Sequence, residues 1–423
     1  MEGSERSLVS LYTGAGGLDL GLEAAGFETR VAVEQDADCV ATVKANRDWP
    51  VIEKDIHDVS SEDILEVAGK RPGDIDLLAG GPPCQPFSKS GYWADGDAGR
   101  LDDPRATTLE AYLRVLRDIR PQVFLLENVA GLAYKSKDEG VRLLRETVSS
   151  INKEIGTEYT FRMSLLNAAD YGVPQERKRV FIIGERSGGS FDFPAPTHQR
   201  LDRGSAHQPG SGGDLQQLEL EDLQPAVTAW DALGDLPEPE NVDDLAMTGK
   251  WADLLPPIPE GCNYQFHTPR GDGLPLFGWR KRYWSFMLKL AKRFPSWTIQ
   301  AQPGSAVGPF HWDDRWLSPR ELCRLQTFPD NYTIKGSQRS AQKQLGNAVP
   351  SALAEVLGME IRAQLLGEGS EVIHSATLVP DLNRPIPGPE SPQSVPDKYK
   401  HRIDDHEPHP GEGKGPRASS ASG

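Results

Sequence analysis

The chain has 423 residues, enough for one large domain with a sizeable core and a second, smaller domain. Its formal net charge of −16 argues against a polyanionic partner unless basic residues cluster locally. The apolar runs are too short to cross a bilayer, the start lacks a signal-peptide pattern, and the four cysteines do not have disulfide or metal-ligand spacing. These features predict a cytoplasmic chain with no membrane association and no metal.

Apolar, β-branched runs recur through the first half of the chain and predict buried strands. They occupy residues 7–13, 28–35, 74–81, 122–129 and 177–186. Helical patterns lie between them, the clearest at 105–120. Strands buried on both faces that alternate with helices predict an α/β fold with a doubly wound, mostly parallel sheet.

The second half of the chain differs in composition. Residues 211–260 hold twelve acids and one base, whereas residues 266–298 hold seven Lys/Arg, one acid and several aromatics. A short helix is expected within 226–236. Another is predicted to begin at Ser318-Pro319, with serine as the cap and proline at the first helical position. A last helix is expected over 340–366.

These changes predict four segments. Residues 1–186 form the domain with the sheet, 187–317 form a smaller domain, and 318–366 return to the first domain. Residues 367–423 form a tail, which has nine prolines in the 51 residues from position 373 and few large apolar residues. We therefore expect the tail to be disordered and dispensable.

A glycine-rich turn follows the first predicted strand, in the stretch LYTGAGGLDLGLEAAG at 11–26. Backbone amides at a helix N-terminus suit a nucleotide-like ligand. Glu34 lies twenty residues after Gly14 at the end of the second strand, where an acid fits two ribose hydroxyls. Asp55, after a further short strand, is suited to accept from an adenine amino group. The spacing predicts an adenosine-containing ligand and leaves NAD, FAD and S-adenosylmethionine open.

Cys84 lies in the stretch GGPPCQPFSKSG, at the carboxyl end of a buried strand. Ligands bind at that edge of doubly wound sheets. A cysteine is more often a small buried hydrophobe, but Pro82, Pro83 and Pro86 fix the backbone on both sides and make burial difficult. A thiol held so firmly before a glycine- and serine-rich loop is suited to act as a nucleophile.

Two further polar groups follow other strands. Glu127 comes after four apolar residues in FLLENVAGL, so we expect partial burial to raise its pKa and favour the protonated acid. Gln175, Arg177 and Arg179 alternate as the chain enters a strand, and period two would direct them to one face. The simpler interpretations are a helix-capping or salt-bridged glutamate for Glu127 and a polar edge strand for the other three residues.

The ordered set of these motifs resembles the C5-cytosine DNA methyltransferase family. It comprises the glycine-rich turn, PPCQPFS, ENV, QERKR, RELCRLQTFPD at 320–330 and GNAVP at 346–350. The resemblance covers roughly residues 7–365 apart from the part near 190–300. Six blocks in family order are highly specific. They imply a Rossmann-like S-adenosylmethionine-dependent methyltransferase fold with a smaller target-recognition domain.

The resemblance implies that Cys84 adds to C6 of cytosine and that Glu127 shares a proton with N3. Arg179 would contact the base near O2, and Arg177 would support Glu127. Residues 88–100 would form a loop that closes on DNA. The cofactor would be S-adenosyl-L-methionine, bound by Tyr12, Gly14, Gly16, Glu34, Asp55, Asn347 and Val349. The family usually has phenylalanine where Tyr12 stands, and both side chains offer an aromatic face for adenine.

The implied substrate is double-stranded DNA, with the target cytosine flipped out of the helix. DNA contacts are expected from Gln85, Ser88, Gln175, Arg280, Lys281, Arg282, Lys289, Lys292 and Arg293. We expect a monomer in a prokaryotic cytoplasm, associated with the nucleoid. A restriction-modification or phage-defence context is implied, and whether a cognate restriction enzyme partners the chain stays open.

Three other functions compete with this one. A tRNA cytosine-5 methyltransferase usually carries Cys-Phe-Thr in its variable lobe, whereas Cys262 is followed by Asn263 and Tyr264. A catalytically silent DNA-binding relative is disfavoured because no catalytic residue is replaced. A nicotinamide oxidoreductase has no evident use for the prolines around Cys84.

Overall fold

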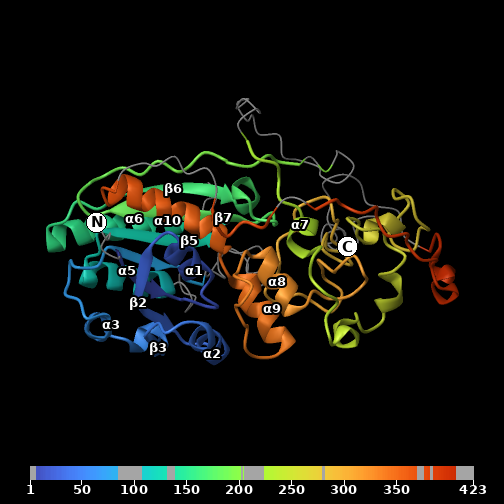
Figure 1. The fold of residues 1–423 in the computed structure, drawn as a ribbon, viewed down its shortest axis with the longest axis horizontal. Coiled ribbons are helices and arrows are strands. Elements are labelled where there is room, and N and C mark those ends of the chain that lie inside the picture. Colours follow the sequence, from blue (N-terminus) through green and yellow to red (C-terminus); the bar gives the residue numbers. More distant parts are fainter. Residues whose placement is uncertain are drawn as a thin grey trace, which may run out of the picture.

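The computed structural model describes residues 6–83, 107–130, 139–201, 203, 223–278, 282–368, 376–381 and 384–405. These residues form two lobes, a large one built on a sheet and a smaller one beside it (Figure 1). Helices α8 (Pro319–Leu325) and α9 (Gln338–Asn347) lie between the two lobes. In the part of the chain described, no helix is both long enough and apolar enough to cross a membrane.

The large lobe contains one seven-stranded sheet in the order β3-β2-β1-β4-β5-β7-β6. Neighbours from β3 to β5 pair in parallel, whereas β7 is antiparallel to both β5 and β6. The strands are β1 (Arg6–Leu11), β2 (Phe27–Glu34), β3 (Val51–Glu53), β4 (Leu77–Gly80), β5 (Val123–Val129), β6 (Thr160–Asn167) and β7 (Lys178–Glu185). The predicted mostly parallel α/β sheet is confirmed.

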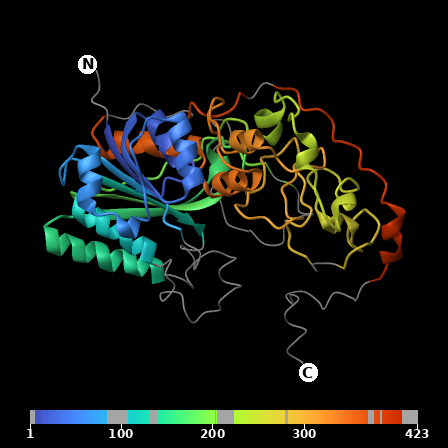
Figure 2. The ribbon, with the colours of Figure 1, turned by 90° about the horizontal axis from the view of Figure 1, so that it is seen from below.

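Helices cover both faces of this sheet (Figure 2). One face packs against α3 (Ser61–Ala68), α5 (Thr107–Ile119) and α6 (Glu139–Ile155). The other packs against α1 (Gly17–Ala24) and α10 (Ser351–Leu365), and α2 (Ala37–Asn46) follows β2. Successive residues of β1 and β5 enter opposite cores, which is why their sequences are continuously apolar.

The helix expected over 340–366 is two helices, α9 and α10, which is a correction to the prediction. Pro350 separates them, because a proline cannot donate the amide hydrogen bond that a continuous helix needs. α10 then packs closely on α1. A Cβ built on Gly21 would lie 2.1 Å from the carbonyl oxygen of Ser351, so only glycine permits this approach.

The small lobe has little regular structure among its described residues. It contains α7 (Ala229–Leu233) and a core of its own that includes Leu254, Tyr264, Phe277 and Phe286. At its border, α8 begins as predicted: Ser318 accepts from the amide of Glu321, and Pro319 occupies the first helical turn.

The expectation of a disordered tail over 367–423 is wrong for residues 376–381 and 384–405. Ala376 is buried in the core between α1, α10 and the sheet, and Tyr399 is buried in the core of the small lobe. The proline-rich composition predicted disorder, but a few widely spaced apolar side chains are enough to bind an extended segment to the two lobes. Residues 406–423 lie outside the described part.

Substituting Gly21 by Ala is expected to lower the free energy of unfolding by about 1–3 kcal/mol, because the new methyl group overpacks the α1–α10 contact. Gly388→Ala is the matched control, since a Cβ there would meet no atom within 4 Å. Urea denaturation of both variants measures the difference. Equal stability of the two variants would contradict the close contact.

Candidate active site

The glycine-rich turn lies at the carboxyl end of β1, and its backbone is unusual. Tyr12, Gly14 and Gly16 have φ values of 58°, 58° and 83°. The Tyr12 amide donates to the Val33 carbonyl at 2.9 Å, which ties the turn to β2. A Cβ built on Gly14 would have only the Tyr12 carbonyl, at 4.0 Å, within reach. The turn therefore leaves open space on the side of Gly14.

Glu34, at the end of β2, is hydrogen-bonded to the backbone of this turn. One carboxylate oxygen accepts from the Gly14 amide at 2.8 Å, and the other accepts from the amides of Gln35 and Asp36 at 2.9 and 2.8 Å. Burial raises the pKa of Glu34, and these amides oppose the rise. A carboxylate has about four lone-pair sites, so it retains capacity for a ligand hydroxyl.

Asp55 lies near the same turn. Its carboxylate accepts from the His57 amide at 2.9 Å, which lowers its pKa. Burial raises the pKa of the Tyr12 hydroxyl, and the Asp55 charge adds to that rise. β3 pairs with β2 in a register that puts Glu53 opposite Glu34, so Asp55, two residues further on, follows at the same edge of the sheet.

The GNAVP segment meets the glycine-rich turn from the other side. A Cβ on Gly17 would lie 2.4 Å from the Val349 carbonyl oxygen, so this segment lies against the start of α1. Asn347 is the last residue of α9. The buried Gln326 amide donates to the carbonyls of Leu345 and Ala348 and fixes the segment. The sequence prediction missed Gln326, although it lies within the matched stretch RELCRLQTFPD.

The segment that leads to Cys84 is anchored as far as the structure describes it. The Asn128 amide lies 3.4 Å from the Pro82 carbonyl, and the Thr108 hydroxyl donates to the Pro83 carbonyl at 3.1 Å. A Cβ on Gly81 would lie 2.9 Å from a carboxylate oxygen of Glu127. Gly81 therefore lies directly beside Glu127. Cys84, Gln85 and Ser88 lie outside the described residues.

Glu127 and Arg179 form an ion pair at this edge of the sheet. Nε of Arg179 lies 3.0 Å from Oε1 of Glu127, and the side chains of Arg179 and Glu127 keep only 16% and 11% of their exposure, respectively. Burial raises the pKa of Glu127 against the opposing charges of Arg179 and Arg177. Burial also lowers the pKa of Arg179. The pair is thus desolvated yet still reachable from outside.

The alternating pattern predicted that Gln175, Arg177 and Arg179 point to one face of a strand. Gln175 and Arg177 do not lie on that strand, because β7 begins only at Lys178. The fully buried Arg177 donates to the carbonyls of Gly346 and Ile299, at 2.8 and 3.4 Å, and affects Glu127 only through its charge. Gln175 is also fully buried. Its amide group donates to Leu325 and accepts from the Ile299 amide. The prediction that Gln175 contacts DNA is therefore not supported.

Comparison with known proteins agrees with this geometry. The family model "C-5 cytosine-specific DNA methylase" matches residues 7–363. The chain belongs to the C-5 cytosine-specific DNA methylase family. The predicted enzyme class, a DNA cytosine-5 methyltransferase, is confirmed.

Individual relatives of this methylase match it over most of their own length. It is 37% identical over 385 residues to the Type II methyltransferase M.SacI of Streptomyces achromogenes, covering 85% of the methylase and 94% of the relative. It is 43% identical over 238 residues to M.AquIA of Picosynechococcus, covering 55% and 90%. The crystal structure of a Spodoptera frugiperda DNMT2 mutant has the same fold, with a TM-score of 0.55, 16% identity and coverage of 84% and 99%.

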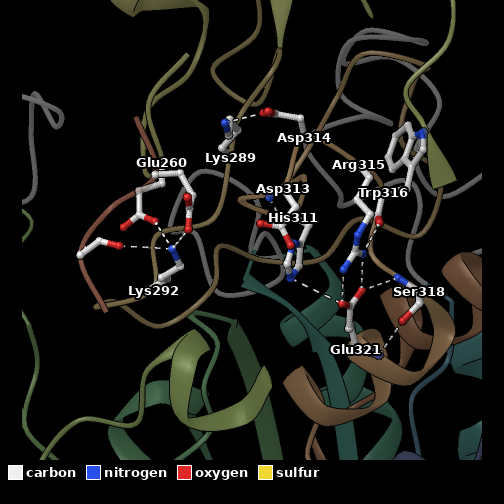
Figure 3. Close-up of polar contacts among 12 residues, drawn as sticks. Glu260, Lys289, Lys292, His311, Asp313, Asp314, Arg315, Trp316, Ser318 and Glu321 are labelled. Atoms are coloured by element: carbon white, nitrogen blue, oxygen red, sulfur yellow. Dashed lines mark hydrogen bonds and ion pairs between the residues drawn. The ribbon is translucent and has the colours of Figure 1, made fainter. Parts of the chain in front are cut away.

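The basic stretch of the methylase does not lie as predicted. Lys289 and Lys292 are buried. Lys289 lies 2.5 Å from Asp314 (Figure 3), and Lys292 lies 2.7 Å from Glu390. Their predicted contacts with DNA phosphates are therefore not supported, since a paired and buried ammonium cannot reach a duplex. Arg282 and Arg293 are exposed. Arg280 and Lys281 lie outside the described residues.

The hydroxyl of Tyr12 connects the glycine-rich turn to the Cys84 segment. It donates to the Thr108 carbonyl at 2.6 Å, and Thr108 in turn donates to Pro83. Tyr12→Phe should keep the aromatic face but release α5 and Pro83. We expect unchanged cofactor affinity by calorimetry and slower alkylation of Cys84 by iodoacetamide. A loss of cofactor affinity with unaltered alkylation would contradict this connection.

Proposed function

We propose that this methylase transfers a methyl group from S-adenosylmethionine to carbon 5 of a flipped-out cytosine in duplex DNA, through a covalent intermediate on Cys84. The observation that carries the proposal is the desolvated Glu127–Arg179 pair, which lies against Gly81 just before Cys84. Glu127 and Arg179 lie beside the backbone that leads to the Cys84 thiol. This arrangement suits a cytosine base that must be protonated while the thiol attacks it.

The reaction follows from the weakness of the target carbon. Carbon 5 of cytosine is a poor nucleophile until the Cys84 thiolate adds to C6 and makes it enamine-like. Glu127 shares its proton with N3 and draws off the charge that this addition creates, while Arg179 stabilises the Glu127 carboxylate and meets the base near O2. After methylation a base removes the C5 proton, the C5–C6 double bond re-forms, and Cys84 leaves as a thiolate.

The residues of the glycine-rich turn fit the cofactor that the family implies. The open side of Gly14, the remaining lone pairs of Glu34 and the nearby Asp55 suit an adenosine group, with the Tyr12 ring for stacking. Asn347 and Val349, against the start of α1, would hold the methionine end. Bound there, S-adenosylmethionine supplies an electrophilic methyl group.

DNA would lie between the lobes, because base chemistry inside a duplex needs a protein wall on each side of the extruded nucleotide. The small lobe would read the target sequence, and Gln85 and Ser88 would contact the DNA from the loop after Cys84. The names of the Type II relatives favour a restriction-modification role, with a cognate restriction enzyme as partner. Bisulfite sequencing of DNA from a host expressing the chain tests the activity and identifies the target.

Cys84→Ser should abolish methyl transfer and leave cofactor binding intact, because an alcohol is almost never ionised near neutral pH whereas a thiol with a pKa of about 8.5 is partly ionised. Incorporation of labelled methyl groups into DNA measures the effect. Cys323→Ser is the control, since Cys323 is buried in α8. Substantial incorporation by the Cys84 variant would exclude the nucleophile role.

Glu127→Gln should lower kcat by about 10²- to 10⁴-fold, the range expected for loss of a general acid. Because burial raises the pKa of Glu127, the wild-type rate should fall as the pH rises through that raised value and the acid loses its proton. The variant should lack this limb of the pH profile. Glu62→Gln is the control, because Glu62 is exposed on α3. If the Glu127 variant keeps the fall in rate at high pH, that fall belongs to another titrating group.

Arg282 and Arg293 are proposed to contact DNA phosphates. The Arg282→Ala/Arg293→Ala double variant should flatten the slope of log affinity against log salt by about 2, since each neutralised phosphate contributes about 0.9. Arg71→Ala/Arg142→Ala, which removes two exposed cations from the large lobe, makes the same charge change as a control. Equal slopes for the two double variants would mean that Arg282 and Arg293 face solvent.

A further inference from the structure

The described residues 376–381 and 384–405, here called the C-terminal strap, lie beyond the family match, which ends at residue 363. The strap begins on the large lobe. Both carboxylate oxygens of the buried Glu355 in α10 accept from it: one from the amide and hydroxyl of Thr377 at 2.8 and 2.7 Å, the other from the Leu378 amide at 3.1 Å. This end is fixed to the helix that packs on α1.

The strap next crosses the junction of the two lobes. Nη1 of Arg384 donates to the Asp231 carbonyl in α7 and to a carboxylate oxygen of Asp235, both at 2.8 Å. Asp235 also accepts from Arg324 of α8 at 3.2 Å. One carboxylate thus joins the strap to a helix at the border of the large lobe.

Lys292 anchors the strap inside the small lobe. Its side chain keeps 2% of its exposure, and its ammonium lies 3.5 Å from Glu260 (Figure 3) and 2.7 Å from Glu390 of the strap. The backbone carbonyl of Lys292 accepts from the Trp230 amide at the start of α7. A buried cation is costly unless it is paired, and Glu390, which itself keeps 59% of its exposure, reaches Lys292 from the surface. It supplies the nearer of the two charges that Lys292 needs.

The far end of the strap enters the core of the small lobe. The Tyr399 ring is buried among the residues of that core, and its hydroxyl donates to the Lys250 carbonyl at 2.7 Å. Lys398 pairs with Asp253, and the Arg402 guanidinium lies 5.3 Å from the centre of the Trp251 ring. The strap runs along the outer side of the small lobe to reach this position (Figure 2).

Lobes of one chain move relative to each other unless something restrains them. We propose that the C-terminal strap is a positioning element that holds the small lobe at the angle needed to engage DNA, with Glu390 as its central anchor. This inference rests on the proposed function, because the small lobe is taken to read DNA. The cofactor site lies on the large lobe, so the strap should affect DNA and leave cofactor binding alone.

The test compares truncation after residue 368, which removes the strap, with truncation after residue 405, which keeps it. If the small lobe of the chain truncated after residue 368 adopts the competent orientation only about a tenth of the time, the KM of that chain for DNA rises about tenfold. We expect that rise with unchanged kcat and unchanged affinity for S-adenosylhomocysteine. Glu390→Gln should raise KM in the same direction, whereas Asp381→Asn, an exposed acid on the same strap, should not.

Hydrogen exchange gives a readout that does not depend on methylation. Loss of the strap should speed exchange at 250–258 and 284–290 in the small lobe and leave β2 of the large lobe protected. Equal DNA KM and equal exchange for the two truncations would overturn the proposal, as would a joint loss of cofactor and DNA affinity. If the full chain methylates no DNA, the proposed function fails. The proposed role of the strap is tested separately, because unaltered hydrogen exchange in the chain truncated after residue 368 would still contradict it.

Discussion

The ion pair between Glu127 and Arg179 depends on one feature of the sheet, the antiparallel insertion of β7 beside β5. Because β7 runs against its neighbour, its first residues lie at the edge where β5 ends, and Arg179 pairs in register with Val129. Glu127 is two residues back on the same face, within reach of a long side chain. A parallel β7 would have carried Arg179 to the opposite edge. The desolvated acid that the proposed reaction needs therefore follows from strand direction.

The same stretch of chain also joins the lobes. Gln175 and Arg177 precede β7 and bind the backbone at Leu325, Ile299 and Gly346. A fully buried guanidinium is costly unless it is hydrogen-bonded, so these carbonyls must stay in place. The segment that positions the proposed catalytic acid through Arg179 thus also fixes the GNAVP segment and the chain at Ile299. The strap adds a second connection on the outer side.

Much of the large lobe could be predicted from sequence because strands buried on both faces are continuously apolar. β6 was missed because its burial is incomplete, with Leu165 largely exposed at the sheet edge. Glu127 could be singled out by the apolar run before it. The partners of Arg177, Gln175 and Lys292 could not, because they lie far along the chain and leave no local pattern. For the same reason the basic stretch suggested phosphate contacts where the fold contains buried ion pairs.

The central claim is that Cys84 attacks the base while Glu127 protonates it. It is tested most directly by incubating the full chain and S-adenosylmethionine with DNA in which 5-fluorocytosine replaces cytosine. Fluorine at carbon 5 cannot be removed as a proton is, so the adduct should persist. Mass spectrometry should find it on the peptide containing Cys84, and Glu127→Gln should strongly slow its formation. An adduct on Cys39, Cys262 or Cys323, or none at all from an enzyme that methylates ordinary DNA, would contradict the account.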